Sequence, residues 1–237
     1  IALSLPVIAK EKYDRVYKYQ SSDGVVSFSD IEPINTPYEI TKVGCFACGL
    51  ISQIDWYTTR LYQSNYQTEI MTFAHAFDVD PALIRAIIHA ESHFKHNAVS
   101  KQGALGLMQL MPDTAIELGI TNRADPDQSI KGGTKYLKQL WKSFEHITDS
   151  IQRTKFTLAS YNCGLYHVKD AQNLAEKRGL NANVWDDNVE VIILDLSLPK
   201  YYNDPIVKYG YVRGIEPYNY VLQIFERYQH YTQFIES

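Results

Sequence analysis

A glutamate occupies an apolar position at the end of a predicted helix. The segment 80–91 begins with Asp-Pro, typical of an N-cap and a first-turn proline, and continues with apolar residues at helical spacing. Ile84, Ile87 and Ile88 form the apolar stripe, and Glu91 takes the next position on that face. Because removal from water disfavours a carboxylate, such a carboxyl stays protonated to higher pH and can donate a proton near neutrality. The alternative is a helix-end glutamate that points to solvent.

Two later segments carry polar side chains suited to holding a polar ligand. Gln109 stands within 103–112, a run of glycines and apolar residues in which its amide supplies a polar contact. Tyr161 and Asn162 place a phenol and an amide just before Gly164. Each segment taken singly is also compatible with a buried core segment or with a helix end.

Two histidines have the spacing of metal ligands on a helix. His89 and His93 are four residues apart, and His96 follows closely. The zinc-protease pattern requires a glutamate immediately after the first histidine, where this chain has Ala90. The helix face that carries His89 and His93 also differs from the face that carries Glu91. We therefore expect solvated histidines and no metal site.

The elements that must position these residues are mainly α-helical. From about Ile54 onward, apolar residues recur at helical spacing. Glycines mark helix ends, such as Gly119 after the segment that starts at Pro112, and Gly179 after a basic helix end. We assign residues 55–237 to one helical domain.

The N-terminal part of the chain has a different pattern. Residues 1–9 are apolar and end in Val-Ile-Ala, which we interpret as the remnant of a signal peptide, with an apolar strand as the alternative. Residues 10–45 contain two β-rich runs on either side of Asp23-Gly24, which predicts a hairpin in a small β module. No stretch approaches the roughly 20 apolar residues of a membrane span. The sequence therefore predicts an exported, soluble, periplasmic protein.

Two of the three cysteines form a Cys-x-x-Cys motif, Cys45 and Cys48. No second cysteine pair completes a set of four zinc ligands. In an exported protein, a disulfide between Cys45 and Cys48 is favoured over redox or zinc chemistry. Cys163 is then left over.

The charge of the chain excludes nucleic acid as a partner class. Lys and Arg number 23 against 27 Asp and Glu, which gives a net charge of -4, and no basic run is present. An anionic polymer would have to be held by shape, stacking and hydrogen bonds. The chain has 18 tyrosines, whose flat rings with a polar tip suit sugar faces but also fill helical cores.

Taken together, the motifs resemble those of soluble-lytic-transglycosylase-like (SLT) catalytic domains. In chain order they are Glu91-Ser92, Gly106-Leu-Met-Gln109-x-Met111-Pro112 and Tyr161-Asn162-x-Gly164. The C-terminal stretch 200–221 resembles the membrane-bound lytic murein transglycosylase F branch, and residues 17–33 resemble a small exported β module of undefined function. The chain departs from the family at Cys163, where a small alanine is usual, and at Pro217, where a threonine is common.

The resemblance implies a lysozyme-like helical fold in which one carboxyl works without a metal or cofactor. Glu91 takes the role of catalytic acid/base. The residues expected to contact the substrate are Ser92, Gln109, Met111, Tyr161, Asn162 and Tyr220. A thiol at Cys163 is expected near the substrate.

The implied activity is lytic cleavage of the β-1,4 bond between N-acetylmuramic acid and N-acetylglucosamine in peptidoglycan, with formation of 1,6-anhydro ends. The apolar residues Leu107, Met108 and Met111 are expected to help exclude water from this reaction. Two alternatives remain open, because a fold does not determine a function. They are a lysozyme-type hydrolase on the same fold and a non-catalytic peptidoglycan-binding or assembly module.

Overall fold

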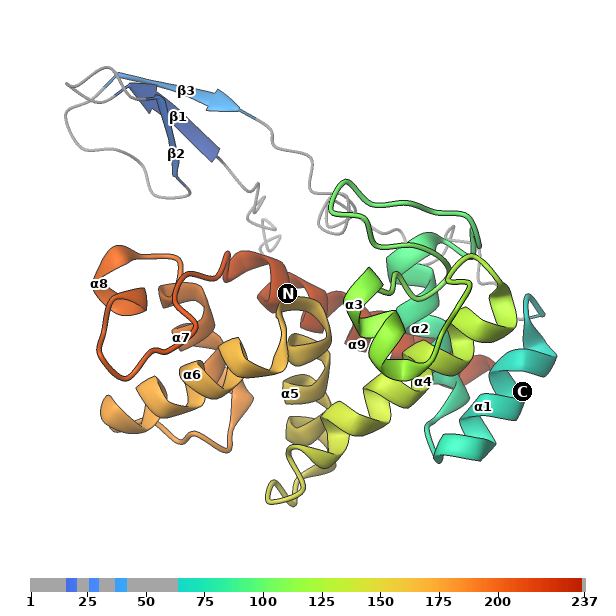
Figure 1. The fold of residues 1–237 in the computed structure, drawn as a ribbon. Coiled ribbons are helices and arrows are strands. Elements are labelled where there is room, and N and C mark those ends of the chain that lie inside the picture. Colours follow the sequence, from blue (N-terminus) through green and yellow to red (C-terminus); the bar gives the residue numbers. More distant parts are fainter. Residues whose placement is uncertain (1–15, 21–25, 30–36, 42–63, 236–237) are drawn as a thin grey trace, which may run out of the picture. The chain divides into compact units, whose positions relative to one another are not determined.

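The computed structural model describes residues 16–20, 26–29, 37–41 and 64–235 of the 237-residue chain (Figure 1). The chain divides into two compact units, residues 1–53 and 54–237. The proposed signal remnant 1–9 and the cysteine pair, Cys45 and Cys48, lie outside the described residues. The boundaries of the predicted β module and of the helical domain at 10–45 and 55–237 stay predictions.

Three short strands are described in the N-terminal unit. They form an antiparallel sheet in the order β2-β1-β3, with β1 at Val16–Gln20, β2 at Val26–Ser29 and β3 at Tyr38–Thr41. The first two strands coincide with the two β-rich runs of the sequence, whereas β3 was not predicted. The turn expected at Asp23-Gly24 lies outside the described residues, so the hairpin module as a unit stays a prediction.

The second unit is helical, as the sequence predicts. Its helices are α1 (Gln67–Phe77), α2 (Pro81–Ser92), α3 (Pro112–Leu118), α4 (Pro126–Lys142), α5 (Ser150–Cys163), α6 (Leu165–Lys177), α7 (Glu190–Asp195), α8 (Pro199–Tyr202) and α9 (Ile215–Ile235), with an irregular turn η1 at Trp185–Val189. None of the described helices is long and apolar enough to cross a membrane.

Local capping explains where the main helices begin and end. The side chain of Asp80 accepts the N–H of Ala82 at 2.8 Å, and α2 starts with a proline that needs no donor there. Asp125 and Asp149 cap α4 and α5 in the same way. Gly119 closes α3 with φ 76°, a conformation that glycine adopts without strain, so the predicted helix end is confirmed.

The helices pack around α5 and α9. In Figure 1, α6, α7 and α8 group on one side of α5, and α1 to α4 group on the other. The long helix α9 contacts α2, α5 and α7, so it joins both groups. Aromatic rings fill the core between them, with Phe156 in contact with Phe144 and with Trp185 at centroid distances of 5.3 and 5.6 Å.

Candidate active site

Glu91 lies in the last turn of α2 and accepts a hydrogen bond from α9. The phenol of Tyr220 donates to Glu91 Oε1 at 2.6 Å. Burial raises the pKa of Glu91 from 4.5 to about 7, although the hydrogen bond from Tyr220 acts in the opposite direction. The carboxyl is therefore able to exist in both its acidic and its basic form near neutral pH.

Two tyrosines accompany this carboxyl, and both remain phenols. Burial raises the pKa of Tyr161 and of Tyr220 well above the usual range, and the negative charge of Glu91 raises both further. The hydroxyl of Tyr161 donates to the carbonyl oxygen of Met108 at 2.9 Å, and its ring lies 5.4 Å from the ring of Tyr136. The structure thus brings Glu91, Tyr161 and Tyr220 together.

The loop before α3 is held in one shape by a glycine and an arginine. Gly106 has φ 91°, and a Cβ there would lie 1.9 Å from the carbonyl oxygen of Arg123. No other residue fits this approach. The Arg123 guanidinium donates to the carbonyl oxygens of Gly103 and Leu110, at 2.7 and 2.8 Å. The loop is therefore fixed to the segment that leads into α4.

Met108 connects this loop to Tyr161. Its N–H donates to Ser129 Oγ of α4 at 3.2 Å, and its carbonyl oxygen accepts the Tyr161 hydroxyl. Gly133 of α4 leaves space for the Met108 side chain, because a Cβ at Gly133 would lie 2.4 Å from the sulfur. Leu107 and Met108 are both fully buried. They therefore belong to the core. Their side chains do not face a substrate, so they do not exclude water from it in the way expected from the sequence.

Gln109 and Met111 lie on the more open part of the same loop. Gln109 has φ 47°, and its amide nitrogen donates to the carbonyl oxygens of Ala98 and Gly106, both at 2.9 Å. This amide nitrogen therefore braces the loop. Met111 is 42% exposed, which leaves its side chain accessible to a ligand.

The remaining expected contact residues differ in their accessibility. Ser92 is 4% exposed, and its hydroxyl donates to the carbonyl oxygen of Ile88 at 3.0 Å within α2. This geometry supports a structural role at the end of α2 rather than contact with a ligand. Asn162 is partly exposed next to Tyr161 at the end of α5.

The expectation of solvated histidines is wrong for His89. Its side chain is 3% exposed and its Nδ1 lies 3.0 Å from the hydroxyl of Tyr231. Burial lowers the pKa of His89 to about 3, and the nearby charges of Arg227 and His93 lower it further. The physical reason is that α9 covers the face of α2 that periodicity assigned to solvent.

Cys163 and Glu216 are two further ionisable groups whose charges interact with each other. Cys163 is partly exposed at the end of α5. Burial raises the pKa of its thiol to about 12, and the charge of Glu216 acts in the same direction. The thiol is therefore protonated at neutral pH. Glu216 in the first turn of α9 forms an ion pair with Arg213, three residues earlier, at 2.8 Å.

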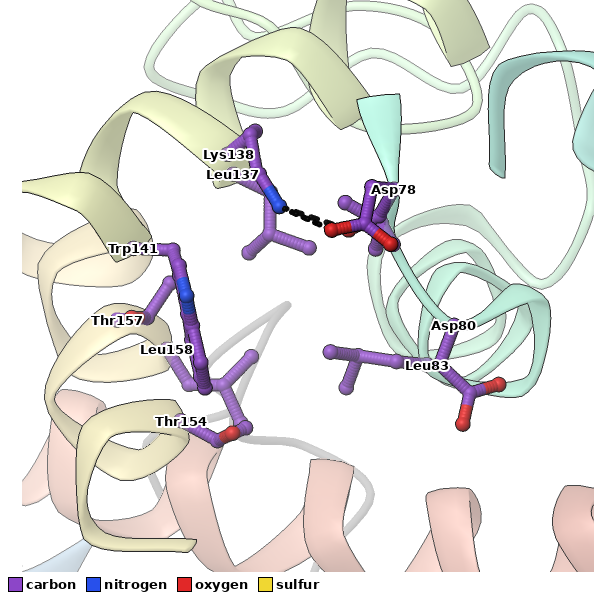
Figure 2. Close-up of a pocket in the computed structure, with 10 residues that line it drawn as sticks. Asp78, Asp80, Leu83, Leu137, Lys138, Trp141, Thr154, Thr157 and Leu158 are labelled. Carbon is purple, nitrogen blue, oxygen red and sulfur yellow. Dashed lines mark hydrogen bonds and ion pairs between the residues drawn. The ribbon is translucent and has the colours of Figure 1, made fainter. Parts of the chain in front are cut away.

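A separate cavity lies at the opposite end of α2. It has a volume of about 200 Å³, and Leu83, Leu137 and Trp141 line it (Figure 2). Lys138 and Asp78 form an ion pair at its edge, with 3.0 Å between Nζ and Oδ2. Glu91 is not among its lining residues, so this cavity and the Glu91 site are distinct.

Solved structures show which fold the helical unit has. The chain is similar to an inactive mutant of lytic transglycosylase Slt from Pseudomonas aeruginosa, with a TM-score of 0.50 and 22% identity over 75% of this chain and 25% of that chain. It is also similar to a 70-kDa soluble lytic transglycosylase in complex with bulgecin A, with a TM-score of 0.52 and 21% identity over the same shares. The helical unit therefore has the lysozyme-like fold of SLT domains, which confirms the predicted fold.

Sequence comparison agrees with this fold. Residues 70–184 match the family model of the transglycosylase SLT domain. The chain is 39% identical over 178 residues to the membrane-bound lytic murein transglycosylase F of Shewanella oneidensis, over 73% of this chain and 37% of the relative. It is 42% identical over 159 residues to the protein of the same name from Stutzerimonas stutzeri, which covers 67% of this chain and 32% of that relative. The chain thus spans about a third of the length of these relatives. Residues 70–184 therefore form a transglycosylase SLT domain.

Proposed function

We propose that this protein is a lytic transglycosylase that cleaves the glycan strands of peptidoglycan, with Glu91 as its catalytic acid/base. The observation that carries the proposal is the Glu91 carboxyl, whose pKa burial raises to about 7 and whose Oε1 accepts the Tyr220 hydroxyl. Membership of the SLT family and the names of the relatives support the substrate class. We further propose that the protein is exported to the periplasm, which the proposed peptidoglycan substrate supports.

In the first step Glu91 is protonated. It donates its proton to the glycosidic oxygen between N-acetylmuramic acid and N-acetylglucosamine, and the bond from this oxygen to C1 of the muramoyl sugar breaks. The acetamido group of the muramoyl sugar, or an oxocarbenium-like centre, carries the positive charge at C1. The Tyr220 hydroxyl stabilises the carboxylate that results, because a hydrogen bond to an ionised acceptor is stronger than one to a neutral acceptor.

In the second step the Glu91 carboxylate removes the proton from the C6 hydroxyl of the same sugar. The C6 oxygen bonds to C1 and closes a 1,6-anhydro ring, and Glu91 returns to its protonated form. No water enters, and no second carboxylate is required, unlike in most glycosidases. An intramolecular hydroxyl held near C1 has a large advantage over water in effective concentration.

We further propose contact roles around this carboxyl. Tyr161 and Asn162 at the end of α5 would hold the sugar, and Gln109 and Met111 would line the glycan groove. Ser92 would act through the helix rather than on the sugar, since its hydroxyl bonds to the carbonyl oxygen of Ile88.

Digestion of purified sacculi in ¹⁸O-labelled water tests the reaction. The proposal predicts unlabelled 1,6-anhydro muramoyl ends, which mass spectrometry distinguishes from hydrolysed ends by the loss of one water. Labelled reducing ends as the main product would show a lysozyme-type hydrolase that uses Glu91 in another way. Binding of sacculi without any new ends would show a binding or assembly module.

A further inference from the structure

Two exposed tyrosines stack on each other near the candidate site. The ring centroids of Tyr166 and Tyr209 lie 4.7 Å apart, and the ring planes are 11° from parallel. Tyr166 is 57% exposed and Tyr209 is 51% exposed, so outer ring surface and ring edges remain open to solvent. We call this pair the tyrosine platform. Exposed aromatic surface held in a fixed, flat arrangement is characteristic of a binding surface.

The platform is not needed to hold its own loop in place. Asp170 of α6 is 2% exposed, and its Oδ2 accepts the N–H groups of Lys208 and Tyr209 at 2.9 and 2.6 Å. The N–H of Val212 donates to the carbonyl oxygen of Leu196 at 3.3 Å. These bonds fix the backbone of the loop without the two rings. Packing of the loop therefore does not explain why both rings are stacked and exposed.

The platform adjoins the elements that build the Glu91 site. Tyr166 lies in the first turn of α6, which begins directly after the end of α5 that carries Tyr161. Since five residues separate them, their Cα atoms are at most about 18 Å apart. The loop that carries Tyr209 leads into α9, which supplies Tyr220. The platform thus lies a short span from Tyr161, so that a linear polymer bound at Glu91 could extend to it.

We propose that the tyrosine platform binds a sugar ring of the glycan strand, beyond the sugars that are held at Glu91. This proposal rests on the proposed function. The C–H faces of a pyranose pack on an aromatic face, and a phenol tip exchanges hydrogen bonds with sugar hydroxyls. Contacts of this kind need no positive charge, which suits a chain of net charge -4 that binds an anionic polymer.

Strand length provides the test, because only a long strand reaches both Glu91 and the platform. The full chain carrying Glu91→Gln, which prevents cleavage, is titrated with short and long peptide-free glycan strands of peptidoglycan, of about four and about eight sugars. Tyr166→Ala or Tyr209→Ala should raise the Kd for the long strand roughly 3- to 10-fold and leave the Kd for the short strand unchanged. Tyr166→Phe, which keeps the ring, should raise the Kd for the long strand by less than Tyr166→Ala does. Ile151→Ala, at a residue 56% exposed on α5, is the matched control and should change neither Kd.

Three outcomes would overturn the proposed role of the platform. The tyrosine variants could leave the Kd for the long strand unchanged, they could raise the Kd equally for both strand lengths, or the Glu91→Gln protein could fail to bind the long strand. These outcomes differ from failure of the proposed function. Labelled reducing ends in the ¹⁸O experiment, combined with length-dependent binding, would reject the transglycosylase reaction and keep the platform.

Discussion

The two ends of α2 carry the same hydrogen bond with opposite consequences. At each end a carboxyl accepts a phenol hydroxyl of α9 at 2.6 Å, Glu91 from Tyr220 and Asp80 from Tyr228. Asp80 precedes the first turn, where it also accepts the N–H of Ala82 and where the positive end of the helix dipole stabilises a negative charge. Glu91 lies in the last turn, where the dipole disfavours a negative charge and burial raises the pKa to about 7.

Burial, rather than the hydrogen-bond partner, therefore decides what each carboxyl does, because Glu91 is shielded from water whereas Asp80 is exposed. Asp80 serves as the cap that fixes where α2 begins. Glu91 is able to release and regain a proton near neutrality, which both steps of the proposed reaction require. Each of the following predictions compares a change at one end of α2 with the matched change at the other.

The largest effect is expected from removing the acidic proton. Glu91→Gln keeps the shape of the side chain, and glycan cleavage should fall by about 10²–10⁴-fold, as is typical for loss of a general acid/base. Asp80→Asn keeps a good N-cap and should leave cleavage per folded molecule near that of the wild type. Mass spectrometry of products from sacculi measures both. Near-wild-type cleavage by Glu91→Gln, or equal losses in both variants, would contradict the assignment.

A smaller effect is expected on stability, and it depends on pH. Burial raises the pKa of Glu91 from 4.5 in water to about 7 in the folded protein, so the folded state binds more protons than the unfolded state between these values. The free energy of unfolding therefore falls as pH rises through this window, and the loss is complete above it. Glu91→Gln should remove this cost of up to about 3 kcal/mol, which raises Tm above pH 7 and changes it little below pH 4.5.

Urea unfolding on both sides of the window provides the measurement. Asp80→Asn is again the control, and it should give no gain in stability above the window. A gain in the free energy of unfolding of the same size at both pH values for Glu91→Gln would show that the desolvation of a charged carboxylate is not its cause.

The smallest effects are expected from the two phenols. Tyr220→Phe removes a hydrogen bond that favours the charged form of Glu91, so the pKa of Glu91 should rise further. In a plot of cleavage rate against pH, the alkaline limb should therefore move to higher pH. The rate should fall by roughly tenfold. Tyr228→Phe should lower the free energy of unfolding by about 1 kcal/mol and leave the pH dependence of the cleavage rate unchanged. A Tyr220→Phe profile that coincides with the wild type would remove Tyr220 from the site.

Local signals in the sequence predicted the helices and the acid. Asp-Pro at the start of α2 and Gly119 after α3 work through capping that involves only neighbouring residues, so they are readable from the chain. Glu91 stood out because it interrupts an apolar stripe. These features survive folding because distant contacts add to them rather than override them.

Contacts between distant segments account for what the sequence did not predict. His89 is buried because Tyr231, 142 residues later, meets it. The hydrogen bond between Tyr161 and Met108 joins residues 53 positions apart. The loop before α3 is held by hydrogen bonds from Arg123 to the carbonyl oxygens of Gly103 and Leu110. Periodicity describes one helix at a time and carries no information on which helix covers which face. Tyr220 was placed at the site only through the family resemblance.

The order of residues along the chain gives α9 a further consequence. Tyr220 follows Glu91 by 129 residues. A chain in which α9 has not yet docked has the acid, but neither the hydroxyl that contacts Glu91 nor the helix that covers α2. The proposed cleaving activity therefore depends on the docking of α9, wherever in the cell the chain folds.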